Sequence, residues 1–264
     1  AWGYAVVIDN RPGAGGTIGD AVAAKAPPDG YTLAIVGMHF IIAPMLHANA
    51  GYDPIRDFAP ITLAAISSVL ISAHPSFPPR DVRELAQFAK GNAVSYVSPG
   101  TGTAGHLAGE LFGVLTGTRL VQIPYKGAAP AMNDLVGGHV KLGFTALPPA
   151  APHVKAGRLR ALAVTTLARS VSLPEVPTVA ESGFPGFSVD NMNGLVAPRG
   201  TPREVVDKLN REIARIVHTP DMKDQLTIQG FDPVGDTPDE FGRYLRAEVA
   251  KWTKVIKVTG LRAE

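Results

Sequence analysis

The 264-residue sequence contains no cysteine, which excludes disulfides, thiolate metal sites and cysteine nucleophiles. Long apolar runs are also missing, and the longest ones fall far short of the length that spans a membrane. Charge is scarce, because only 18% of the residues are charged and no run of Lys or Arg exceeds two residues. With a formal net charge of +2, nothing indicates a surface for nucleic acid or for a membrane.

What is present is typical of a globular protein that buries a core. Apolar residues make up 45% of the chain, and its 28 Gly and 23 Pro are spread along it, which indicates a loop-rich fold. The length suffices for one large domain or two smaller ones. The sequence begins at Ala1 without a charged-then-apolar leader, so we interpret it as processed or trimmed, and its residues alone do not specify a compartment.

The stretch Ser95–Leu111 is the one from which most of the functional interpretation starts. Residues 94–98 alternate as in a short strand, Pro99 and Gly100 end it, and apolar residues then recur at helical spacing. Such a turn presents free backbone N–H groups at a helix N-terminus, where the helix dipole also attracts an anion. The sequence therefore predicts that this turn holds a carboxylate or a phosphate. We call Ser98, Gly100, Thr101, Gly102 and Thr103 the anion seat.

Two other interpretations of this turn stay open. Gly100, Gly102 and Gly105 match the G-x-G-x-x-G pattern of dinucleotide-binding folds, which makes an NAD(P)-binding oxidoreductase an alternative. That pattern wants an acidic residue at the end of the next strand, but the strand Arg119–Ile123 is followed by Pro124 and lacks Asp and Glu. The glycines can also serve only to make a tight turn.

Strands and helices alternate through the middle of the chain, which indicates an α/β layer with a largely parallel sheet. Strands are expected at Tyr4–Ile8, Tyr31–Val36, Ile61–Ala73, Leu120–Ile123, Val140–Phe144, Leu159–Thr165 and Phe187–Val196, and helices at Asp81–Lys90 and Ala128–Val136. The loops Ser98–Thr103, Tyr125–Gly127 and Thr145–Leu147 follow three strands and should share one edge of the sheet.

Capping boxes are predicted at Thr178–Glu181, Thr201–Glu204 and Thr237–Glu240, and the last two should begin helices. The spacing of Trp252 in the final helix indicates a core residue.

The sequence contains few motifs that would indicate catalysis. Ser98 and His106 lie eight residues apart across a turn, and a nucleophile would need a third, orienting group. No G-x-S-x-G or H-E-x-x-H motif occurs, and the seven histidines are scattered, so neither a hydrolase nor a metal site is indicated.

Many segments together resemble one family. The matching motifs are Asn10–Gly19 (NRPGAGGTIG), Pro27–Leu33 (PPDGYTL), Tyr52–Pro54 (YDP), Asp57–Ile61 (DFAPI), Ser98–Thr103 (SPGTGT), His106–Leu107 (HL), Pro124–Ala131 (PYKGAAPA), Leu173–Glu181 (LPEVPTVAE) and Gly200–Pro202 (GTP). They run in family order along essentially the whole chain. The sequence resembles the Bug-type extracytoplasmic solute receptors of tripartite tricarboxylate transporters.

The resemblance implies an α/β fold of the type II periplasmic binding protein class, with two lobes, a two-crossing hinge and a ligand cleft between the lobes. Lobe 1 would comprise residues 1–71 and 191–264, and lobe 2 residues 72–190, with the crossings near Ile71 and Asn191. It also implies a periplasmic protein that binds a small carboxylic acid, mostly through loop backbone and bridging waters. Such a receptor performs no chemistry, needs no cofactor, is usually a monomer, and delivers its ligand to membrane transporter subunits.

On this hypothesis the ligand contacts come from both lobes. From lobe 2 we expect the anion seat, Tyr125, Lys126 and Gly127 facing it, and Thr145 and Ala146 close by. From lobe 1 we expect Gly37, Met38, His39, Asn191 and Asn193. Lys126 would attract the acid at long range, although a lysine is usually solvated. A ligand-sensing partner of a signalling protein would have the same fold and remains a further alternative.

The sequence departs from the family in two places. Family members normally open with a strand and a Gly-rich, Asp-containing loop and helix before Val6–Asn10, and this sequence begins after them. We therefore expect the chain to bind acids weakly. A dissociation constant in the micromolar range or below would contradict this expectation. Members also often carry an aromatic residue near Met192, where methionine is softer and more adaptable.

Overall fold

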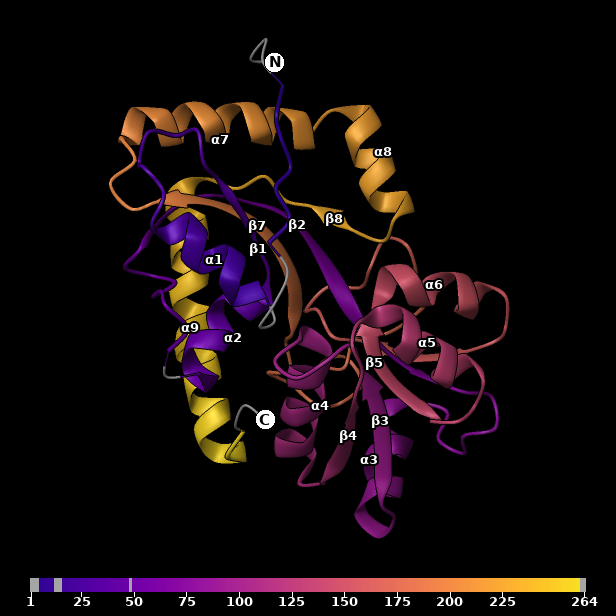
Figure 1. The fold of residues 1–264 in the computed structure, drawn as a ribbon. Coiled ribbons are helices and arrows are strands. Elements are labelled where there is room, and N and C mark those ends of the chain that lie inside the picture. The colour runs from indigo at the N-terminus through magenta and orange to yellow at the C-terminus, as the bar shows by residue number, and fades with distance from the viewer. Residues whose placement is uncertain (1–4, 12–15, 48, 262–264) are drawn as a thin grey trace. The chain divides into compact units, whose positions relative to one another are not determined.

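The computed structural model describes residues 5–11, 16–47 and 49–261 (Figure 1). They form two compact units, of which the first comprises the described parts of residues 1–65, 192–224 and 233–253. The second comprises 66–191, 225–232 and 254–261. The chain passes between the units inside strand β2 (Phe58–Ala73), after Ala65, and near the start of β7 (Asp190–Pro198), after Asn191.

This division differs from the predicted lobe boundaries in the segments 66–71, 225–232 and 254–261 and at Asn191. The first belongs to the second unit because Val69, Leu70 and Ile71 pair with two of its strands. The second belongs there because Ser172 donates a hydrogen bond from its hydroxyl to the carbonyl of Thr227, at 2.8 Å.

The first unit has a small sheet and several helices. Strand β1 (Ala34–Val36) pairs antiparallel with β7, β7 lies next to β2, and the short β8 (Asp232–Pro233) pairs with β2. Its helices are α1 (Thr17–Ala24), α2 (Met38–Leu46), α7 (Arg203–Val217) and most of α9 (Pro238–Thr259), while α8 (Pro220–Ile228) straddles the boundary of the units. Ile61, Ala197, Val206 and Leu209 form an aliphatic core. Trp252 is fully buried, which confirms its predicted place in the core.

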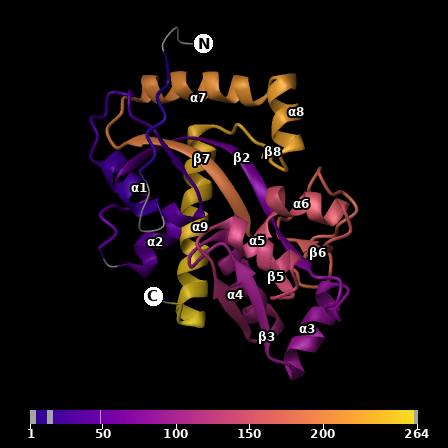
Figure 2. The ribbon, with the colours of Figure 1, turned by 45° about the vertical axis from the view of Figure 1, so that its right-hand side comes forward.

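The second unit is the α/β layer that the alternation of elements predicted. Its strands are β3 (Val94–Ser98), β4 (Leu120–Pro124), β5 (Leu142–Ala146), β6 (Arg160–Val164) and the end of β2, and its helices are α3 (Val82–Gly91), α4 (Ala104–Thr116), α5 (Ala128–Val136) and α6 (Leu147–Lys155). The order is β6-β2-β5-β3-β4, and Figure 2 brings β6 into view. Strands β3, β4 and β5 are parallel, whereas β2 runs antiparallel to β5 and β6. The sheet is therefore largely parallel, with one reversed strand.

The two faces of this sheet bury different kinds of side chain. Helices α5 and α6 cover an aliphatic cluster that includes Leu70, Leu135 and Leu147. The opposite face carries aromatic rings, because Phe144 on β5 packs edge-on against Tyr96 of β3 and Phe112 of α4. Helix α4 is thus held on one face by large rings, while α5 is held on the other by aliphatic side chains.

The predicted caps met three different outcomes. At Thr237–Glu240 the box forms and α9 follows, with Thr237 Oγ1 accepting from the Glu240 amide and Glu240 accepting from the Thr237 amide. The reciprocal bonds also form at Thr178–Glu181, but only a turn follows. At Thr201 the hydroxyl donates to the carbonyl of Pro198 instead, so α7 begins at Arg203 without a side-chain cap.

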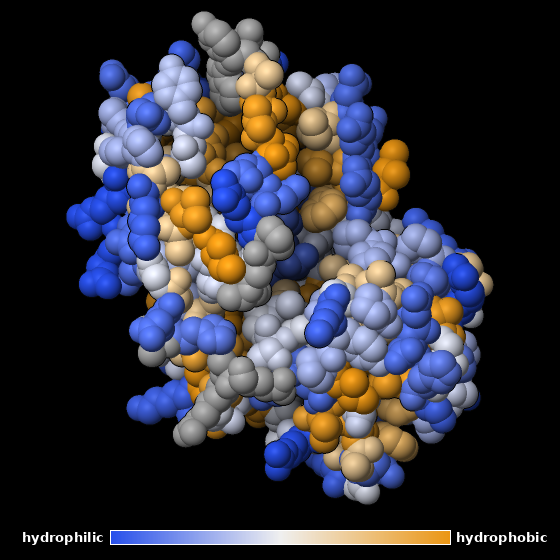
Figure 3. Space-filling view, in the orientation of Figure 1, coloured by the Kyte–Doolittle hydropathy of each residue, from blue (hydrophilic) through white to orange (hydrophobic). Residues whose placement is uncertain are grey.

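The predicted strand at Tyr4–Ile8 is wrong where it can be judged. Tyr4 lies outside the described residues, and Ala5–Ile8 form no strand. Val6, Val7 and Ile8 are 72%, 84% and 69% exposed, and Figure 3 shows that hydrophobic residues reach the surface on the face that it draws. Their apolar character predicted a strand, but the described part of the chain offers them no partner strand.

Candidate ligand site

Two strand-to-helix turns lie side by side at the carboxyl ends of β3 and β4. The parallel register places Ser98 opposite Pro124, so both strands end at the same level. The amide of Tyr125 donates to the carbonyl of Ser98 at 3.2 Å, and the amide of Gly127 donates to that of Pro99 at 2.9 Å. The predicted neighbourhood of the anion seat and Tyr125–Gly127 is therefore built by direct backbone hydrogen bonds.

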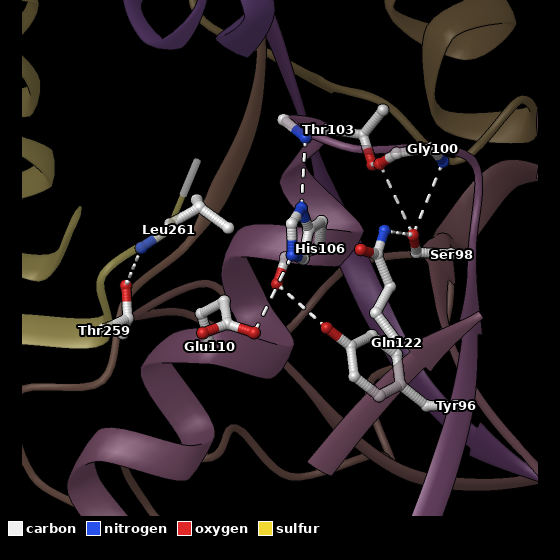
Figure 4. Close-up of polar contacts among 10 residues, drawn as sticks. Tyr96, Ser98, Gly100, Thr103, His106, Glu110, Gln122, Thr259 and Leu261 are labelled. Atoms are coloured by element: carbon white, nitrogen blue, oxygen red, sulfur yellow. Dashed lines mark hydrogen bonds and ion pairs between the residues drawn. The ribbon is translucent and has the colours of Figure 1, made fainter. Parts of the chain in front are cut away.

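Several polar groups of the anion seat form hydrogen bonds within the turn itself (Figure 4). The Gly102 amide donates to Nδ1 of His106 at 3.1 Å. The Gly100 amide lies 3.4 Å from Ser98 Oγ, and the Thr103 amide lies 3.4 Å from the Gly100 carbonyl. The Thr103 hydroxyl donates to the same carbonyl at 2.7 Å, so it leaves α4 without a side-chain cap.

The other amides of this turn take no part in these internal hydrogen bonds. Within the described part of the chain, no acceptor is found for the amides of Thr101, Ala104, Gly105 and His106. Three of these belong to the first turn of α4, a 13-residue helix whose dipole adds partial positive charge. Thr101 and Thr103 are half-buried, so the turn reaches the surface of its unit. The arrangement suits a carboxylate or another oxyanion.

Helix α5 adds a second uncapped N-terminus beside the first. Its N-cap is Gly127, which has a φ of 113° and open space where a Cβ would lie. Among the residues that the structure describes, the amides of Ala128 and Ala129 have no acceptor, while Pro130 has no N–H. Because Gly127 is bonded to Pro99, the donors of α4 and α5 converge on one region.

The side chains of Tyr125 and Lys126 take different directions. The Tyr125 hydroxyl donates a short hydrogen bond to Asp134 on α5. Burial, and then this bond, raise the pKa of Tyr125 to about 12, and the same bond holds the pKa of Asp134 below its ordinary value. Lys126 is exposed and forms no ion pair with the described residues. Lys126 is therefore an exposed positive charge within one of the paired turns.

The third loop of the predicted edge offers fewer donors. Helix α6 starts directly after Ala146 with Leu147, Pro148 and Pro149, and the two prolines lack N–H groups. Thr145 is fully buried, and its hydroxyl has no hydrogen-bond partner in the described part of the chain. This loop therefore offers fewer backbone donors than the other two, although the Thr145 hydroxyl remains without a partner among the described residues.

The candidates predicted for lobe 1 are found in different settings. Gly37 caps α2 without a side-chain bond, and Met38 is 2% exposed, so its side chain belongs to the core. His39 Nε2 lies 3.4 Å from Asp20 Oδ2, a carboxylate that also accepts from the Tyr52 hydroxyl.

Two asparagines of β7 complete the predicted contacts, and the division of the chain separates them. Asn191 belongs to the second unit, where its Nδ2 donates to Ser67 Oγ at 2.9 Å, while Asn193 belongs to the first.

The third glycine of the dinucleotide pattern has a packing role. A Cβ on Gly105 would lie 2.1 Å from the Phe144 carbonyl oxygen, and one on Gly109 would lie 2.3 Å from the Tyr96 ring. Gly105 and Gly109, four residues apart on one side of α4, let the helix approach the sheet closely, while a Cβ on Gly113 would meet the Thr118 carbonyl just after the helix. The pattern is thus explained without a nucleotide.

The serine and histidine considered as a catalytic pair do not contact each other. Ser98 Oγ accepts from the Gln122 side-chain amide at 2.7 Å, and His106 Nδ1 accepts from Gly102. Sequence reasoning missed Gln122 altogether and considered His106 only as a base. The signal for Gln122 was its register, since it pairs with Tyr96 two residues before Ser98.

A hollow of about 400 Å³ in the second unit is a poor place for an anion. Its lining comes mainly from Ile66 of β2, the loop after β6, and the start of β7, and includes no residue of the anion seat. Asp190 and Asp232 line it, and its one arginine, Arg169, is already bonded to Glu181 at 2.8 Å. Within the described residues no helix is long and apolar enough to cross a membrane, and no cluster of metal-ligand side chains is found.

A family model described as "Tripartite tricarboxylate transporter family receptor" matches residues 1–261. The chain belongs to this family. Among the relatives are "UPF0065 protein in tcbD-tcbE intergenic region" of Pseudomonas sp. (strain P51), 39% identical over 96% of this chain and 76% of the relative, and "Protein BugT" of Bordetella pertussis, 33% identical over 98% and 81%. The predicted Bug-type resemblance is confirmed.

Solved structures of similar proteins agree with the fold. "R. palustris Rpa4515 with adipate" has 38% identity and a TM-score of 0.88, and covers 99% of this chain and 88% of its own. "Structure of periplasmic binding protein BugD" has 37% identity and a TM-score of 0.84 over 98% and 88%. "MatC (Rpa3494) from Rhodopseudomonas palustris with bound malate" has 31% identity and a TM-score of 0.76 over 92% and 85%. The predicted α/β fold of the periplasmic binding class is confirmed, and the family is one of solute-binding receptors.

Proposed function

We propose that this protein is an extracytoplasmic receptor that captures a small carboxylic acid and releases it unchanged to a tripartite tricarboxylate-type transporter. The observation that carries the proposal is the pair of uncapped helix N-termini, α4 and α5, joined by the bonds of Tyr125 and Gly127 to the neighbouring turn. Amides without acceptors and a helix dipole suit a carboxylate, which accepts several hydrogen bonds at once. Adipate and malate in two structural neighbours support the same ligand class.

The proposal includes a location and a movement. The family is named for a transporter, and one neighbour is titled a periplasmic binding protein, which supports a periplasmic receptor that meets membrane subunits. The two places where the chain passes between the units, inside β2 and near the start of β7, would serve as the hinge, where a few residues absorb the closing rotation. The proposal includes no chemistry on the ligand; Ser98 and His106, the pair considered for it, are bonded to Gln122 and Gly102 and not to each other.

The test is titration calorimetry with adipate, malate and citrate, alongside NAD⁺ as the probe for the competing oxidoreductase interpretation. Binding of an acid without turnover supports the receptor, and binding of NAD⁺ instead refutes it. The Thr101→Pro variant removes one outward amide and should lose about tenfold in affinity, as expected for one charge-assisted hydrogen bond. Thr101→Val is the matched control, because it keeps the amide and removes only the hydroxyl. Equal affinity of both variants would show that the Thr101 amide is not used.

A further inference from the structure

His106 lies directly beneath the turn that carries the free amides. It is the third residue of α4 and its side chain is 4% exposed. Its Nδ1 accepts from the Gly102 amide at 3.1 Å, and its Nε2 lies 3.7 Å from Glu110 Oε1, one helical turn further on (Figure 4). The Tyr96 hydroxyl donates to the His106 carbonyl at 3.3 Å and ties this part of α4 to β3.

The bond to Gly102 decides which way the amides of the turn point. Gly102 has a φ of 77°, a conformation that glycine adopts readily and other residues rarely. In it, the Gly102 N–H points inward to the imidazole, while the neighbouring Thr101 amide is left without an internal acceptor. An acceptor beneath Gly102 therefore stabilises the arrangement that leaves Thr101 and the first turn of α4 free.

Only one protonation state of the ring can play this part. A nitrogen that accepts a hydrogen bond carries a lone pair, so Nδ1 must be unprotonated and the proton must sit on Nε2. The carboxylate of Glu110 is the charged group on the Nε2 side, although 3.7 Å is too long for a direct hydrogen bond. The neighbouring titratable group from β3, Tyr96, contacts the backbone carbonyl of His106 and not the ring.

We infer that His106 is a positioning residue of the receptor: its Nδ1 lone pair holds the Gly102 amide inward and thereby fixes the outward amides that receive the carboxylate. The inference rests on the proposed function and names the group that organises the same site. The imidazole of His106 does not touch the ligand in this scheme. Its effect on affinity passes entirely through the backbone of Gly102.

Calorimetry with adipate and malate on matched variants tests the inference. His106→Leu removes the acceptor, and affinity should fall about tenfold or more, because a buried amide is left without a partner. His106→Asn offers a side-chain carbonyl oxygen as a neutral acceptor and should bind within about threefold of wild type. His153→Leu is the control, because His153 lies in the last turn of α6, away from the anion seat, and this variant should bind as wild type does.

The outcomes separate the two proposals. Wild-type protein that binds none of the acids refutes the receptor function and this inference with it. Wild-type protein that binds, with His106→Leu equally tight or His106→Asn as weak as His106→Leu, overturns the inference alone. If His106→Leu does not fold, the imidazole ¹⁵N shifts of the wild-type protein decide: an unprotonated Nδ1 supports the assignment, and a proton on Nδ1 overturns it.

Discussion

Replacing Gly105 with alanine tests how closely α4 must approach the sheet. The new Cβ would lie 2.1 Å from the carbonyl oxygen of Phe144, whereas ordinary contact begins near 3.4 Å. The shortfall is 3.4 − 2.1 = 1.3 Å, and the atom in the way is backbone of β5, which lies between β2 and β3 and cannot rotate aside. The first turn of α4 must therefore move outward, and the amides of the anion seat must move with it.

The magnitude follows from two opposing terms. Overpacking of this kind costs about 1–3 kcal/mol, and the upper end applies because the obstacle is backbone. Alanine in a helix recovers at most about 1 kcal/mol relative to glycine. We expect a net loss of about 2 kcal/mol in the free energy of unfolding. Gly91→Ala is the control, because nothing lies within 4 Å of its Cβ position, and it should be neutral or stabilising by up to about 1 kcal/mol.

Urea denaturation measures the stability of both variants, and calorimetry with adipate measures affinity. Gly105→Ala should be less stable and should also bind at least about tenfold more weakly, because its donors are displaced. Stability within about 0.5 kcal/mol of wild type would refute the argument for close packing. Unchanged affinity in a clearly destabilised variant would separate the helix position from the ligand site.

Three further predictions follow from exposed groups. Lys126→Gln should weaken acid binding severalfold at low salt, and the difference from wild type should shrink at high salt; Lys90→Gln, also exposed, should change neither. Asp81→Ala should cost about 1 kcal/mol in urea denaturation, because Asp81 accepts two amide bonds at the start of α3. Bonds from Thr237 hold the pKa of Glu240 below its ordinary 4.5, so the folded state releases this proton more readily than the unfolded state. Its stabilisation is present above about pH 4.5 and lost in acid, and Glu240→Gln should flatten the acid limb of a thermal-melting profile.

Periodicity predicted the strongest elements of the fold well. Helix α5 spans Ala128–Val136 as expected, and β2 contains the whole predicted strand Ile61–Ala73. These segments bury apolar residues, and the spacing of such residues is the signal that can be read directly from a sequence. Helix α8 was missed because it lacks this signal: none of its residues is buried, and it has no apolar stripe.

Local signatures were less dependable because they do not specify their surroundings. The boxes at Thr178 and Thr237 make the same reciprocal bonds, yet only Thr237 begins a helix. Glycine spacing placed the turn after β3 correctly, but it does not specify the bonds that His106 makes to the Gly102 amide and Gln122 makes to the Ser98 hydroxyl. Whether the predicted ligand contacts are used remains a prediction for the experiments above.

The prolines at the start of α6 make backbone hydrogen-bond donors unevenly distributed along the edge where β3, β4 and β5 end. Helices α4, α5 and α6 begin at this edge. Pro148 and Pro149 have no N–H groups, so the first turn of α6 provides fewer hydrogen-bond donors than the first turns of α4 and α5. If the proposed function holds, a symmetrical diacid that met only this edge would find more donors for one carboxylate than for the other. A receptor built in this way would be strict about the head group of its ligand and lenient about the length of the tail.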